Sequence, residues 1–252
     1  MINKRGQVTI FIIIAIVIIG ATVGYFAFKD SIKISGIPAN IEPVYTSFLS
    51  CLEDISKEGI YQIALHGGYY NVPNETSITY FTEEIPYYYI NSENNIPSIN
   101  LIEDEFGGYV SENLEGCFNL NNFKKQGFDI NIINYSVSAK INTKEANIKM
   151  DYPITIQKGE TKIQLKEFET SIDTNIQNLY GVSKEIVNSY SKNPGAVCLT
   201  CLDKISKKNN VEIKSIPILN VSIFENNIIW FFISEKEDYS ENKLTYVFVI
   251  EQ

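Results

Sequence analysis

The most apolar stretch of the chain lies close to its beginning. Residues 7–28 form a run of 22 residues without Asp, Glu, Lys, Arg or His. As a helix rising about 1.5 Å per residue, this run spans roughly 33 Å, enough to cross a hydrocarbon core of about 30 Å. A cleaved secretory signal has an apolar core of only about 7–15 residues. The pattern therefore predicts a membrane-spanning helix over residues 7–28.

Charges on either side of this span predict its orientation. The basic pair Lys4-Arg5 precedes the span, whereas the basic residues that follow it are partly offset by Asp30. An excess of Lys and Arg is typical of the cytoplasmic side. We expect residues 1–6 in the cytoplasm, residues 29–40 as an external linker, and the remainder as an extracellular domain.

The start of the span carries a short motif. Lys4-Arg5-Gly6 is followed by Gln7 and an aliphatic run, which resembles the class III signal sequences of archaeal type IV pilins and archaellins. The resemblance covers residues 4–28. It implies a prepilin-type peptidase as a partner, which cuts between Gly6 and Gln7 on the cytoplasmic side. The mature helix then self-associates with its copies along a filament axis.

Two features depart from that family. The fifth residue after the expected cut is Phe11, where bacterial pilins have Glu. Pilin helices commonly continue from the membrane into the head, whereas Gly36-Ile37-Pro38 is expected to interrupt the helix here. An uncleaved single-pass anchor, whose basic residues only set its topology, is the alternative interpretation.

Beyond the linker, the periodicity of apolar residues predicts an α+β fold. Apolar residues three or four positions apart indicate an amphipathic helix over residues 41–65, and a second helix is expected over 103–120. Residues 69–100 are rich in Pro and Asn and are expected to be irregular or to form short edge strands. Together, residues 41–127 are expected to form a helical and irregular lobe.

Residues 128–252 are expected to form a second, β-rich lobe. Alternating apolar and polar residues over 128–166, with turn residues between the runs, predict an antiparallel meander with one wet face. Helices are expected near 172–191 and 197–207. Four strands are expected to follow, at residues 211–216, 219–224, 228–234 and 244–250.

Composition narrows the classes of function. The net charge is −9, from 30 acidic and 21 basic residues. A nucleic-acid partner is not expected, because phosphate binding needs a surplus of Lys and Arg. We also expect no metal, no cofactor and no catalytic residue. His66, the single histidine, lies at a helix end, where it can bind the last carbonyls, and has no evident nucleophile beside it.

Two other groups of side chains have a structural and a functional interpretation. The acidic residues offer calcium ligands or paired acids, but they lack EF-hand spacing, and a solvated acidic face is expected instead. The tyrosines at 69–70 and 87–89 suit a sugar-stacking or adhesive surface, and half-buried strand positions explain them equally well. The acidic residues concerned are Glu103, Asp104, Glu105, Glu112 and Glu115.

All four cysteines follow the span, and the predicted topology places them outside the reducing cytosol. An even number there favours two disulfides. Four cysteines allow three pairings, and we favour Cys51 with Cys117 and Cys198 with Cys201. The Cys198-Leu-Thr-Cys201 spacing also suits a redox dithiol at a helix start. A four-cysteine zinc site would require three loops to converge.

Three Asn-x-Ser/Thr sequons are candidate glycosylation sites on an external domain. They begin at Asn74, Asn134 and Asn220. Asn74 lies in the irregular stretch, whereas the other two lie within expected strands, where a glycan needs the wet face.

These patterns predict an archaeal cell-surface structural protein: a pilin-like filament subunit, or an anchored surface component, rather than an enzyme. One alternative is a membrane-anchored domain for adhesion or binding that does not polymerise. Another is an extracytoplasmic thiol oxidoreductase that uses Cys198 and Cys201.

Overall fold

The computed structural model describes residues 37–80, 82–117, 120–132, 134–218, 227–236 and 243–252. Pro43–Gln252 form one compact unit of mixed helix and sheet, which agrees with the expected α+β class. Within the described ranges, no helix is both long enough and apolar enough to cross a membrane. The expected span at 7–28 lies outside them.

The helices form where apolar residues recur at helical spacing. Residues 37–41 are not helical, and the first described helix begins at Glu42. The carbonyl oxygen of Pro38 accepts hydrogen bonds from the amides of Ile41 and Glu42 at this helix start. The helices are α2 (Glu42–Leu65), the 3-10 helix η1 (Asn74–Thr76), α3 (Ile99–Cys117), α4 (Leu120–Lys125), α5 (Ile176–Tyr190) and α6 (Leu199–Asn209).

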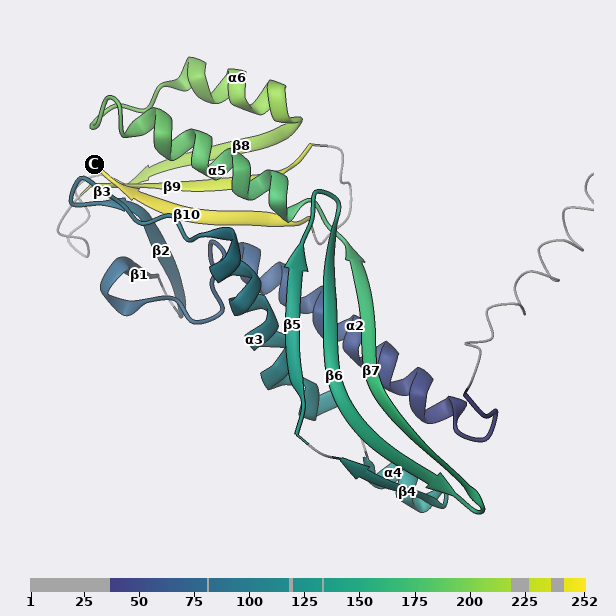
Figure 1. Cartoon of the computed structure of the whole chain (residues 1–252). Coiled ribbons are helices and arrows are strands. Elements are labelled where there is room, and N and C mark those ends of the chain that lie inside the picture. Colours follow the sequence, from purple (N-terminus) through teal and green to yellow (C-terminus); the bar gives the residue numbers. More distant parts are fainter. Residues whose placement is uncertain (1–36, 81, 118–119, 133, 219–226, 237–242) are drawn as a thin grey trace, which may run out of the picture. The chain divides into compact units, whose positions relative to one another are not determined.

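The strands belong to two sheets, whose arrangement is visible in Figure 1. The strands are β1 (Ser77–Tyr80), β2 (Glu83–Ile90), β3 (Glu93–Asn94), β4 (Phe128–Ile132), β5 (Ser136–Ile141), β6 (Glu145–Lys158), β7 (Thr161–Asp173), β8 (Val211–Ile218), β9 (Ile228–Glu235) and β10 (Thr245–Glu251).

The first sheet is the predicted antiparallel meander. β7 pairs with β6 along its length, and β5 and β4 pair in turn with the other edge of β6. Exposed and buried residues alternate in β5 and β6, as one wet face requires. β7 extends to Asp173, so the next helix begins at Ile176, later than the sequence predicts.

Helix α2 runs along one face of this sheet (Figure 1). The ring of Phe48 in α2 lies 5.0 Å from the ring of Phe168 in β7 and 5.1 Å from that of Tyr152 in β6. α3 packs beside β5 and approaches α2 closely at Gly59, where a Cβ atom would lie 2.7 Å from Tyr109. These aromatic contacts form the core of this part of the domain.

The second sheet has the strand order β1-β2-β10-β9-β8, with β3 on β2. β2 and β10 are parallel neighbours, so one sheet contains strands from both of the expected lobes. The expectation of irregular structure or edge strands over residues 69–100 is wrong for β2, which is an inner strand. Pro86 lies before the residues that pair with β10, so its missing N–H does not interrupt that ladder.

Helices α5 and α6 lie over β8, β9 and β10 (Figure 1). Beneath them, the rings of Phe231 and Phe248 stack 5.2 Å apart, and Tyr88 stacks 4.6 Å from Phe248. Asn210 ends α6 in a left-handed conformation, after which β8 begins at Val211. The expected strand over 219–224 lies outside the described residues.

Candidate functional site

The start of α6 contains a disulfide between Cys198 and Cys201, whose Cα atoms are 5.1 Å apart. Cys198 is the N-cap of α6 and is exposed. Cys51 is also disulfide-bonded, but it is buried in α2, with its sulfur 4.0 Å from the carbonyl oxygen of Leu114 in α3. The side chain of Cys117, the partner expected for Cys51, lies outside the described residues.

Two of the three sequons lie within the described residues. Asn74 starts η1 and is exposed. Asn134 is exposed as well, but it lies in the connection between β4 and β5 rather than within a strand. Asn220 lies outside the described residues, as do the expected processing residues Gly6 and Gln7.

His66 links the end of α2 to the start of β2. Its Nδ1 lies 2.8 Å from the carbonyl oxygen of Gln62, and its Nε2 lies 3.0 Å from Glu83. A carbonyl oxygen and a carboxylate are both hydrogen-bond acceptors, so the ring lies between two acceptors. The role expected of a histidine at a helix end is therefore confirmed.

Two of the five acidic residues of α3, Glu103 and Glu105, have partners in the fold, whereas the other three are exposed. Glu103 is only 6% exposed and accepts hydrogen bonds from the Ile141 amide (3.0 Å) and from Lys140 Nζ (2.6 Å). One oxygen of Glu105 accepts from two backbone amides after α2, at Tyr70 and Asn71, each at 2.8 Å. The expectation of a solvated acidic face is wrong at Glu103, because the sequence does not reveal that β5 covers it.

Most of the candidate surface tyrosines are in the interior. Tyr69, Tyr88 and Tyr89 are buried, and Tyr87 is partly buried in an apolar cluster of the second sheet. Tyr70 donates a hydrogen bond to Glu112 from its hydroxyl group. The strand interpretation therefore holds for residues 87–89, and the adhesive interpretation does not.

A hollow of about 510 Å³ lies between α2, α3 and the first sheet. Burial raises the pKa of Tyr152 to about 12, with smaller effects from Tyr135 and Glu115, so this phenol remains protonated at neutral pH. Tyr135 donates a hydrogen bond to the carbonyl oxygen of Ser111. The aromatic and apolar lining residues include Phe48, Leu114, Leu120, Ile132, Tyr135 and Tyr152.

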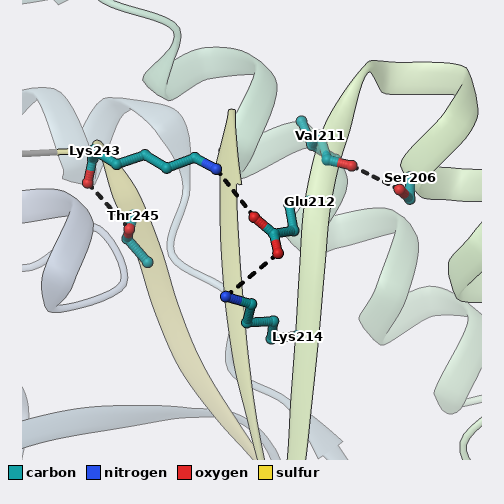
Figure 2. A network of polar contacts seen from close by, with 6 residues as sticks. All are labelled: Ser206, Val211, Glu212, Lys214, Lys243 and Thr245. Atoms are coloured by element: carbon teal, nitrogen blue, oxygen red, sulfur yellow. Dashed lines mark hydrogen bonds and ion pairs between the residues drawn. The ribbon is translucent and has the colours of Figure 1, made fainter. Parts of the chain in front are cut away.

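A polar network ties the second sheet together near the start of β10 (Figure 2). Glu212 accepts from Lys243 Nζ at 3.0 Å and lies 3.3 Å from Lys214 Nζ. The hydrogen bond from Lys243 is the largest cause that lowers the pKa of the Glu212 carboxyl, and the hydrogen bond from Lys214 is the second. No local pattern relates residue 243 to residue 212, so the sequence alone does not reveal this network.

Within the described part of the chain, no three or more His, Cys, Asp or Glu side chains come together as a possible metal site. Comparison with protein-family models, with curated proteins and with solved structures found no match to the chain. The function is therefore inferred from the sequence pattern and from the geometry of the domain.

Proposed function

We propose that the protein is a structural component of the archaeal cell surface, a type IV pilin-like filament subunit. Residues 7–28 would anchor it in the membrane before assembly, with the N-terminus in the cytoplasm, and form the filament core afterwards. The observation that carries the proposal is that the first helix after the predicted linker, α2, is built into the core of the folded domain.

Aromatic packing attaches α2 firmly to the first sheet. The Phe48 side chain is 1% exposed and packs against Tyr152 and Phe168, and Tyr45 stacks on Phe168 at 5.5 Å. The N-terminal segment therefore connects to the domain through α2, a helix that is packed into the core. That attachment suits a subunit whose neighbours are fixed by their N-terminal helices.

The wet face of the first sheet suits a domain surrounded by water. Lys149 in β6 lies 3.2 Å from Glu167 and 3.7 Å from Glu169, both in β7, and the three side chains are 45–65% exposed. Neighbouring charges of opposite sign keep such a face hydrated.

The proposal is tested by determining the N-terminal residue of the native protein and its location in its native cells. We expect the chain recovered from sheared filaments to begin at Gln7. Gly6→Phe should block cleavage and keep the protein in membranes, whereas Gly20→Ala, within the span, should still be processed.

A different result would overturn the filament proposal. If the native chain begins at Met1 and is found in membranes but in no sheared filament fraction, the protein is a single-pass anchored domain for adhesion or binding.

A further inference from the structure

The Cys198–Cys201 disulfide is not placed like a structural cross-link. It lies within the first turn of α6 and joins no two elements, whereas a disulfide stabilises most when it closes a long loop. Cys198 is exposed, and the neighbouring Leu199 is 70% exposed. Cys51, in contrast, is disulfide-bonded and only 7% exposed.

Two hydrogen-bond donors are directed at the sulfur of Cys198. The backbone amide of Cys201 lies 3.2 Å from it, and the hydroxyl oxygen of Thr200 lies 3.5 Å from it. A disulfide sulfur carries no proton, so both groups donate to it. The N-terminal end of a helix also carries partial positive charge. A negative charge on this sulfur is therefore stabilised when the disulfide opens.

We propose that Cys198 and Cys201 form a thiol–disulfide exchange site that accepts electrons from an external dithiol. One thiolate of the dithiol attacks the sulfur of Cys198, and the bond to Cys201 breaks. The sulfur of Cys201 leaves with the electron pair and takes up a proton.

In the mixed disulfide, the first sulfur of the external dithiol is bonded to Cys198. The second thiolate of the same dithiol then attacks this first sulfur and releases Cys198 as a thiolate. Two electrons move from the external dithiol, which becomes a disulfide, to the protein, which becomes a dithiol. The amide of Cys201 and the hydroxyl of Thr200 stabilise the Cys198 thiolate that is released. The exposed Leu199 offers an apolar contact to the reductant beside the reacting sulfur.

The first experiment compares the two disulfide sites of the folded, full-length protein. We would add graded dithiothreitol, alkylate the free thiols and map them by mass spectrometry. Cys198 and Cys201 should be labelled at a rate about tenfold or more above that of Cys51, since exchange depends on access to the sulfur. Equal resistance at both sites until the domain unfolds would overturn the proposal.

The second experiment tests the role assigned to each sulfur. Cys201→Ser leaves the Cys198 thiol, which should react with an aromatic disulfide reagent about tenfold faster at pH 7 than the Cys201 thiol of Cys198→Ser. Adding Thr200→Ala to Cys201→Ser should slow the reaction. Equal rates for Cys201→Ser and Cys198→Ser would contradict the assigned roles. α6 has no buried residue, so these substitutions leave the core intact.

Discussion

The phenol oxygens of Tyr88 in β2 and Tyr246 in β10 lie 2.6 Å apart, and both side chains are completely buried. The Tyr88 oxygen also lies 2.7 Å from the carbonyl oxygen of Gly67, which can only accept. Tyr88 therefore donates to Gly67, and Tyr246 donates to Tyr88. The pair joins the turn after α2 to the parallel contact between β2 and β10.

This direction of donation predicts unequal effects of two conservative substitutions. Tyr246→Phe removes one hydrogen bond and should lower the free energy of unfolding by about 1 kcal/mol. Tyr88→Phe should cost about 2–3 kcal/mol, because it also leaves the Tyr246 hydroxyl and the Gly67 carbonyl without this partner. Urea denaturation of both variants measures the difference. A larger loss for Tyr246→Phe would show that the assigned direction is wrong.

The buried tyrosines predict a loss of stability in alkali. Burial raises the pKa of Tyr88 and of Tyr246 well above the ordinary value of 10, and raises that of Tyr109 to about 12. The unfolded chain therefore loses these protons first as the pH rises. The contribution of these tyrosines to the free energy of unfolding is therefore fully present below pH 10 and decreases above it.

The measurement is the free energy of unfolding between pH 8 and pH 11.5. Tyr246→Phe should have a shallower decline above pH 10 than the wild-type protein. Tyr61→Phe, at a position that is 39% exposed, is the matched control and should follow the wild-type curve. Identical slopes for all three proteins would rule out Tyr246 as a cause.

Gly68 should not tolerate a side chain. Its φ is +89°, and a Cβ atom would lie 2.8 Å from Cγ1 of Ile102 and 2.9 Å from the hydroxyl of Tyr246. Gly68→Ala should cost about 2–4 kcal/mol through backbone strain together with the clash. Gly127 has a similar φ of +84° but open space around it, so Gly127→Ala isolates the backbone strain and should cost about 1 kcal/mol. Thermal denaturation would distinguish the two.

Two carboxylates with lysine partners should differ in importance. Glu103 is buried and binds a backbone amide of β5, so Glu103→Gln should cost about 1–3 kcal/mol. The side chain of Glu212 is 42% exposed, and solvent screens its two ion pairs, so Glu212→Gln should cost less than about 1 kcal/mol. Urea denaturation at pH 7 compares them, and a greater loss at Glu212 would contradict this ranking.

The Glu212 effect should also depend on pH (Figure 2). Its lysine partners lower its pKa in the folded state, so its contribution is present above the ordinary value of 4.5 and is lost as the pH falls through the folded-state value. The difference between wild type and Glu212→Gln should therefore shrink in acid. A difference that does not change with pH would show that packing is responsible.

Local periodicity predicted α2 and α3 within a few residues and identified the meander of β5, β6 and β7. These elements depend on contacts between residues that are close in the sequence, and turns hold consecutive strands together. The disulfide of Cys198 and Cys201 is local in the same sense, because its ends are only three positions apart in the sequence.

Periodicity identifies the apolar face of an element, but it does not specify which element covers that face. The parallel pairing of β2 with β10 and the burial of Tyr88 both depend on chain segments far apart in the sequence. The segments 51–57 and 201–207 illustrate the limit most clearly, since they match at five of seven positions. Tertiary packing buries Cys51 of α2 against α3, whereas its counterpart Cys201 is partly exposed, because α6 lies on the outside of its sheet and has no buried residue.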